Sequence, residues 1–136
     1  MRKYRLYNRF NYLSNQKQHI IIKRIISVER RVEITSVMHG VRWYMNNHDK
    51  DINMPSCPHC HAHGKSWKLN IYTGRIYDKN KCIGQIGIKE FYKMWIQEEF
   101  RDAVLRERKW YNENYHDKNP IRYPELPPLP KLDLKR

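Results

Sequence analysis

The apolar residues between positions 88 and 104 recur at the spacing of an α-helix, and this stripe constrains the fold more than any other feature. It predicts a helix that continues to about Tyr111 and carries charged residues on its other side. The members of the stripe are Ile88, Phe91, Tyr92, Trp95, Ile96, Phe100, Ala103 and Val104. Such a helix needs a second layer of structure against which its apolar side is buried.

Short segments typical of β-strands precede the helix and supply this layer. The β-branched segment 18–37 predicts one or two strands, although residues 16–31 also fit a helix, and residues 38–46 predict another strand. The Asn-, Asp-, Pro- and Ser-containing run 46–56 predicts a loop. The runs "HCHAH" and "WKLNIY" predict further strands, and "IYTGRIY" is typical of a hairpin. We therefore expect an α+β fold, with a small antiparallel sheet packed against one long C-terminal helix.

The 136 residues are enough for one compact domain of ordinary size, which we expect to span residues 18–118. Residues 1–17 are basic and aromatic, and we interpret them as an arm. Residues 119–136 contain five prolines within positions 120–130, which is too many for a helix or a central strand. We expect them to form an extended Pro-rich tail.

The net charge of +13 is large for this length and unevenly distributed. Residues 1–31 hold nine Lys and Arg residues against one acid, Glu29. Basic side chains interleaved with aromatic ones are typical of surfaces that contact phosphates and stack on bases, so RNA or another nucleic acid is the expected partner. An acidic protein partner, or simply a basic solvent-facing surface, also fits. The predicted nucleic-acid-binding residues are Arg2, Lys3, Arg5, Tyr7, Arg9, Lys23 and Arg24.

No apolar run approaches the length of a membrane span, and the first residues lack the apolar core of a secretory signal. Three cysteines are an odd number for a disulfide framework. These features favour a reduced, cytoplasmic location without membrane contact.

The stretch "PSCPHCHAHGKSWK" (residues 55–68) concentrates the side chains that can carry chemistry. If residues 59–63 form a strand, their three histidines point to one face and Cys60 points to the other. Histidine serves as a general base or acid near neutral pH. We therefore predict metal-independent cleavage of RNA in which His59 and His61 transfer protons and Lys65 and Lys68 stabilise the charged phosphorane.

A zinc site is the alternative interpretation of the same stretch. Cys57 and Cys60 have the spacing of two thiolate ligands at a tight turn, Cys82 is a candidate third ligand, and the fourth would be a histidine of the stretch or His48. A single C-x-x-C pair is a weak signal. A third interpretation makes the histidines ordinary residues of a binding module.

The loop ahead of this stretch carries another possible ion site. Asp49 and Asp51 beside His48 can bind a divalent ion, but the run "NNHDKDIN" is more typical of an ordinary polar loop, and the sequence favours the loop.

Residues 40–110 resemble a family of small bacterial proteins of uncharacterised function. The shared pattern is a strand, a loop with Asp, His and Asn, the motif Pro-His-x-His-Ala, a strand ending in Thr-Gly, and a long helix. The matching positions are His48, Pro58, His59, His61, Ala62, Thr73 and Gly74. The resemblance implies a setting beside toxin–antitoxin or phage-defence genes and says little about activity. The three cysteines depart from the pattern, and the loop before Pro58 is longer than in the family.

The sequence as a whole predicts an RNA-acting toxin of such a system, most simply an endoribonuclease without a cofactor. The alternative is a non-enzymatic nucleic-acid-binding or regulatory protein of the same kind of system, stabilised by a structural zinc.

Overall fold

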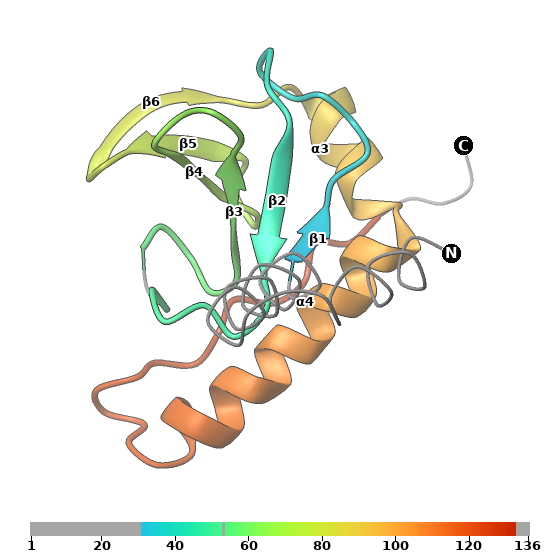
Figure 1. Ribbon diagram of the computed structural model, residues 1–136. Coiled ribbons are helices and arrows are strands. Elements are labelled where there is room, and N and C mark those ends of the chain that lie inside the picture. Colours follow the sequence, from blue (N-terminus) through green and yellow to red (C-terminus); the bar gives the residue numbers. More distant parts are fainter. Residues whose placement is uncertain (1–30, 53, 133–136) are drawn as a thin grey trace, which may run out of the picture. The chain divides into compact units, whose positions relative to one another are not determined.

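A computed structural model describes residues 31–52 and 54–132, and those from Val32 onward belong to one compact unit (Figure 1). Its strands form a six-stranded antiparallel sheet in which each strand lies beside its neighbours in sequence. The strands are β1 (Arg31–Glu33), β2 (Trp43–Asn46), β3 (His59–Ala62), β4 (Trp67–Asn70), β5 (Arg75–Asp78) and β6 (Lys81–Gln85). Helix α3 (Ile88–Trp95) and helix α4 (Glu98–Tyr111) follow, and α4 continues into the π-helical turn η1 (Asn112–His116).

One face of the sheet forms the hydrophobic core. Cys60, Leu69 and Ile76 pair across β3, β4 and β5, and all three are fully buried. The helices pack against this face, which we call the core face (Figure 1). Their buried contributions are Met94, Trp95, Phe100, Ala103 and Val104. Burying this apolar surface is the main favourable term in folding.

The opposite face of the sheet carries a row of polar and aromatic side chains. Tyr44 pairs with His61, His61 with Lys68, and Lys68 with Tyr77, so the row crosses β2, β3, β4 and β5. Directly paired residues of antiparallel strands lie on the same face. These four residues, which we call the polar row, are each partly exposed.

The helix predicted for residues 88–111 is divided into α3 and α4 because Gln97 leaves the helical conformation. The Gln97 side-chain oxygen accepts hydrogen bonds from the backbone N–H of Thr35 (3.3 Å) and from its hydroxyl (2.9 Å). Its amide nitrogen donates to the Ser36 hydroxyl (3.2 Å). These contacts join the start of α4 to the segment after β1. Glu99, which a continuous helix places on the apolar stripe, is instead exposed in the first turn of α4.

Strand β6 and the turn before β2 differ from the sequence-based expectation. Residues 81–85 form a strand although their composition indicates none, because their backbone pairs with β5 around a bulge. Residues 38–41 form a tight turn rather than the beginning of β2. His39 and Gly40 at its centre both have positive φ angles, which fits the type of turn that reverses a chain over two residues.

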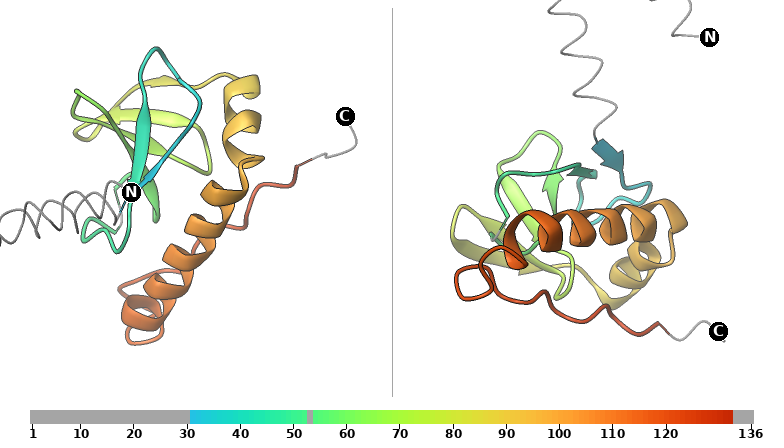
Figure 2. Two further views of the ribbon diagram at one scale, coloured as in Figure 1. Left: turned by 45° about the vertical axis from the view of Figure 1, so that its right-hand side comes forward. Right: turned by 90° about the horizontal axis from the view of Figure 1, so that it is seen from below.

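The Pro-rich tail has no regular secondary structure from residue 124 to residue 132 and runs back beside α4 (Figure 2). Tyr111 of α4 donates its hydroxyl to the carbonyl of Pro124 (2.7 Å). Arg108 donates to the carbonyl of Pro127 and to the Tyr72 hydroxyl. The tail is therefore tied to the helix by hydrogen bonds to its carbonyls, which proline retains.

The predicted α+β fold, a small antiparallel sheet with a long C-terminal helix, is confirmed, and α4 with η1 makes a helical segment of 19 residues. Residues 18–30, to which the sequence assigned strands or a helix, lie outside the described residues, as does the arm 1–17. Among the described residues, no helix is both long and apolar enough to cross a membrane.

The core face predicts a contrast between two leucine-to-alanine substitutions. Leu69→Ala removes a fully buried side chain of β4 and is expected to lower the free energy of unfolding by about 2–5 kcal/mol. Leu105→Ala removes a side chain of α4 that is 52% exposed and is expected to change it by about 0.5 kcal/mol or less. Urea unfolding measures both values, and equal losses would contradict the assignment of the core.

Candidate active site around Asp49, His59 and His61

His59 and His61 meet at one carboxylate. Both extend from the polar side of β3, as strand alternation predicts, with ring centroids 4.7 Å apart. Nε2 of His61 lies 2.7 Å from Oδ2 of Asp49, and Nε2 of His59 lies 3.4 Å from the same oxygen. His59 is buried, whereas the side chains of His61 and Asp49 are 19% and 21% exposed. The site is therefore closed on the side of His59 and open on the side of His61.

The two imidazoles determine the ionisation of Asp49. Burial alone would raise the pKa of this carboxyl. Contacts with the His59 and His61 rings and a hydrogen bond from the backbone N–H of Asp51 outweigh burial and hold the pKa of Asp49 far below its ordinary value. Asp49 therefore presents a fixed negative charge to both histidines at neutral pH.

Helix α4 holds the loop that carries Asp49. The backbone N–H of His48 donates to Oε2 of Glu107 (2.7 Å), and the His48 ring stacks on Trp110 with centroids 4.9 Å apart. Glu107 is 3% exposed, and burial raises the pKa of its carboxyl. His48 itself has a positive φ of 52°, which is uncommon for a residue with a side chain. These contacts fix the backbone immediately before Asp49.

The two predicted lysines have different positions. Lys68 is in the polar row beside His61 and forms an ion pair with Asp51. Lys65 is exposed and lies over the ring of Trp67, 4.9 Å from its centroid. Trp67 packs against the core, on the same side of β4 as Leu69. The structure thus brings Lys68, but not Lys65, to the histidines.

The three cysteines are not brought together. Cys60 is fully buried in the core face, while Cys82 is exposed and pairs with Tyr77 at the end of the polar row. The two thiols are therefore on opposite faces of the sheet. In the part of the chain that the structure describes, only Asp49, His59 and His61 form a group of three side chains close enough to share a metal ion. The predicted zinc set of Cys57, Cys60 and Cys82 is not assembled.

All predicted nucleic-acid-binding residues of the N-terminal segment lie outside the described residues. They are Arg2, Lys3, Arg5, Tyr7, Arg9, Lys23 and Arg24, and their role stays a prediction.

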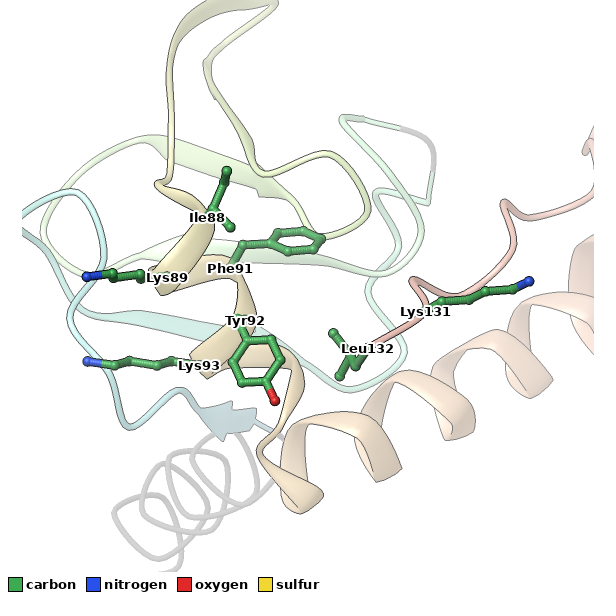
Figure 3. A pocket seen from close by; sticks show the side chains of 7 residues that line it. All are labelled: Ile88, Lys89, Phe91, Tyr92, Lys93, Lys131 and Leu132. Atoms are coloured by element: carbon green, nitrogen blue, oxygen red, sulfur yellow. The ribbon is translucent and has the colours of Figure 1, made fainter. Parts of the chain in front are cut away.

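A pocket of about 600 Å³ lies elsewhere, between α3 and the tail (Figure 3). Phe91, Tyr92 and Leu132 contribute apolar surface, and Lys89 and Lys93 extend from one side of the helix in the figure. None of the histidines lines this pocket, so it is distinct from the site at Asp49.

The chain matches no protein-family model, no curated protein and no solved structure in comparisons with known proteins.

Sequence reasoning underestimated Asp49 and overlooked Glu107. The signal for Asp49 was its place beside His48, a position in the family pattern, but the sequence favoured an ordinary loop. Glu107 follows Phe100, Ala103 and Val104 at the helical spacing of the buried side of α4. A carboxyl group on that side is costly unless it is hydrogen-bonded, which marks it as a residue with a specific partner.

The positions of the cysteines predict which thiols react in the native protein. Cys82 is exposed and is expected to react readily with a thiol reagent. Burial, together with the charges of Glu107 and Asp49, raises the pKa of Cys57 to about 12, and burial also raises the pKa of Cys60. Because the thiolate is the reactive form, both are expected to stay unmodified until the protein unfolds.

The reaction of the native protein with the thiol reagent is measured both without and with a strong metal chelator. One modified thiol per native chain is expected in both conditions. Release of Cys57 and Cys60 by the chelator alone would show that these cysteines hold a metal.

Proposed function

We propose that the chain binds RNA across the polar row of the sheet and cleaves it beside Asp49 and His61. The observation that carries this proposal is that the row Tyr44–His61–Lys68–Tyr77 leads directly to Asp49, the carboxylate that His59 and His61 share. The row combines aromatic rings, on which bases stack, with a cation and an imidazole.

The charge of the protein supports a polyanionic substrate. The whole chain carries a net charge of +13, of which residues 32–136 contribute +5, from 18 basic and 13 acidic residues. A positive charge of this size attracts the phosphate backbone independently of its sequence. Within the site, Lys68 provides a cation beside His61, where it can offset the charge of the phosphorane.

The Asp49–His61 pair suits proton transfer. A carboxylate only accepts hydrogen bonds, so the 2.7 Å contact places the proton of a neutral His61 ring on Nε2 and leaves the lone pair on Nδ1. Nδ1 then takes the proton of a 2′-hydroxyl as its oxygen attacks the phosphorus. The bond from phosphorus to the 5′-oxygen breaks, and the leaving oxygen takes a proton from solvent. The products are a 2′,3′-cyclic phosphate and a 5′-hydroxyl.

The geometry changes the roles that the sequence suggested for the two histidines. His59 is buried and its Nδ1 contacts the carbonyl of Ser56, so RNA cannot reach this ring as it reaches His61. We assign His61 the proton-transfer role, and Asp49 holds its ring through the 2.7 Å contact. The family resemblance adds a toxin–antitoxin or phage-defence setting to the proposal, with an acidic protein as the second partner.

The second candidate is a nucleic-acid-binding or regulatory protein that performs no chemistry. The polar row favours it equally, since aromatic and basic side chains on a sheet face suffice to hold a single strand. The two candidates differ in whether bound RNA is cut.

Replacement of His61 tests the proposed reaction. His61→Ala is expected to lower the rate of RNA cleavage by about 10²–10⁴-fold, the usual contribution of a positioned acid or base. The matched control is His116→Ala, because His116 contacts only the carbonyl of Tyr123 among the described hydrogen bonds and is outside the site. Cleavage of a fluorescent RNA is measured for both variants and for the unmodified chain.

The control variant is expected to cut RNA at the unmodified rate. Salt-sensitive RNA binding without cleavage by the unmodified chain would favour the second candidate. Equal cleavage by all three proteins would contradict the proposed site.

A further inference from the structure

We propose that Asp49, His59 and His61 bind one divalent transition-metal ion, with zinc as the ion that the donor atoms suit best. This inference goes beyond RNA cleavage and does not depend on it, because an ion can occupy the site in a protein that acts on another substrate.

The buried nitrogen of His59 is the first observation. Nδ1 of His59 lies 2.9 Å from the carbonyl oxygen of Ser56, which can only accept, so Nδ1 carries a proton. In the neutral ring Nε2 is then a bare lone pair. It is buried and has no hydrogen-bond partner among the described residues. The 3.4 Å separation from Asp49 is a close approach without hydrogen-bond geometry.

A lone pair that faces a carboxylate is an unfavourable arrangement unless something positive lies between them. A second proton on His59 would satisfy it, and so would a metal ion. The hydrogen bond from Nδ1 to a backbone carbonyl is the outer contact that metal-bound histidines usually make, because it fixes the tautomer and directs Nε2 toward the ion. The contact with Ser56 therefore prepares His59 as a ligand.

The distances are compatible with a shared ion. The ligand atoms of the three residues all lie within 4.8 Å of one another. Ligands at zinc distances of about 2.0–2.2 Å in a tetrahedral site are about 3.3–3.5 Å apart. The separation of 3.4 Å between His59 Nε2 and Asp49 Oδ2 already has this value. His61 and Asp49, now 2.7 Å apart, need to separate by several tenths of an ångström as the ion replaces their shared proton.

Two nitrogens and one carboxylate oxygen make a donor set for a borderline transition metal rather than for magnesium, which prefers oxygen alone. Three protein ligands leave a further position, and the partial exposure of His61 and Asp49 places it toward solvent. A water bound there is acidified by zinc. It would stand beside the polar row and could take the proton that the free imidazole takes in the proposed reaction.

The test is a metal titration of the full, untagged chain without RNA. Chelator-treated protein is titrated with Zn²⁺ by calorimetry and with Co²⁺ by visible absorption. One ion per chain is expected. Asp49→Asn and His61→Ala are each expected to weaken binding at least about 10–100-fold. Loss of a residue that only supports a metal ligand already weakens metal binding by this factor.

Two variants of matched chemistry serve as controls. His63→Ala removes a histidine that contacts Glu33, and Asp102→Asn removes an exposed carboxylate of α4. Both are expected to bind the ion as the unmodified chain does. Far-ultraviolet circular dichroism establishes that each variant is folded.

The proposal is overturned if the unmodified chain takes up no ion, or if Asp49→Asn and His61→Ala bind it as tightly as the controls. Metal uptake without RNA cleavage would contradict the proposed function alone. Cleavage at full rate in excess chelator, with no metal uptake, would contradict the metal site alone.

Discussion

The contact of two imidazoles with one carboxylate is the interaction on which the proposed site depends. Asp49 belongs to a loop, and its position requires support from outside that loop. Glu107 provides it by accepting the backbone N–H of His48. The same helix buries Phe100, Ala103 and Val104 in the core. Helix α4 therefore links the packing of the fold to the geometry of the site, and loss of core packing is expected to disturb both.

The alternation of side chains along β3 gives the sheet two chemically different faces. Cys60 is buried in the core face while His59 and His61 on either side of it face Asp49. In a strand, successive side chains point to opposite faces. The stretch that resembles half of a zinc finger is thus divided between the hydrophobic core, which holds Cys60, and the opposite face of the sheet, which holds His59 and His61.

The sequence predicts those parts of the fold and site that follow from local periodicity. The helical stripe and the alternation at residues 59–63 identified α4 and the face shared by His59 and His61. Contacts between distant residues were not predictable in this way. The bonds from Gln97 to Thr35 and Ser36 divide the helix, and pairing with β5 makes β6 a strand despite its composition. Asp49 was treated as part of an ordinary loop, because only tertiary structure brings it to the histidines.

Anomalous diffraction from crystals of the full chain grown with zinc tests most directly whether Asp49, His59 and His61 bind one metal ion together. We expect one peak about 2.0–2.2 Å from Nε2 of His59, Nε2 of His61 and a carboxylate oxygen of Asp49. A peak at the cysteines, or crystals with bound zinc elsewhere and none at Asp49, would contradict the account.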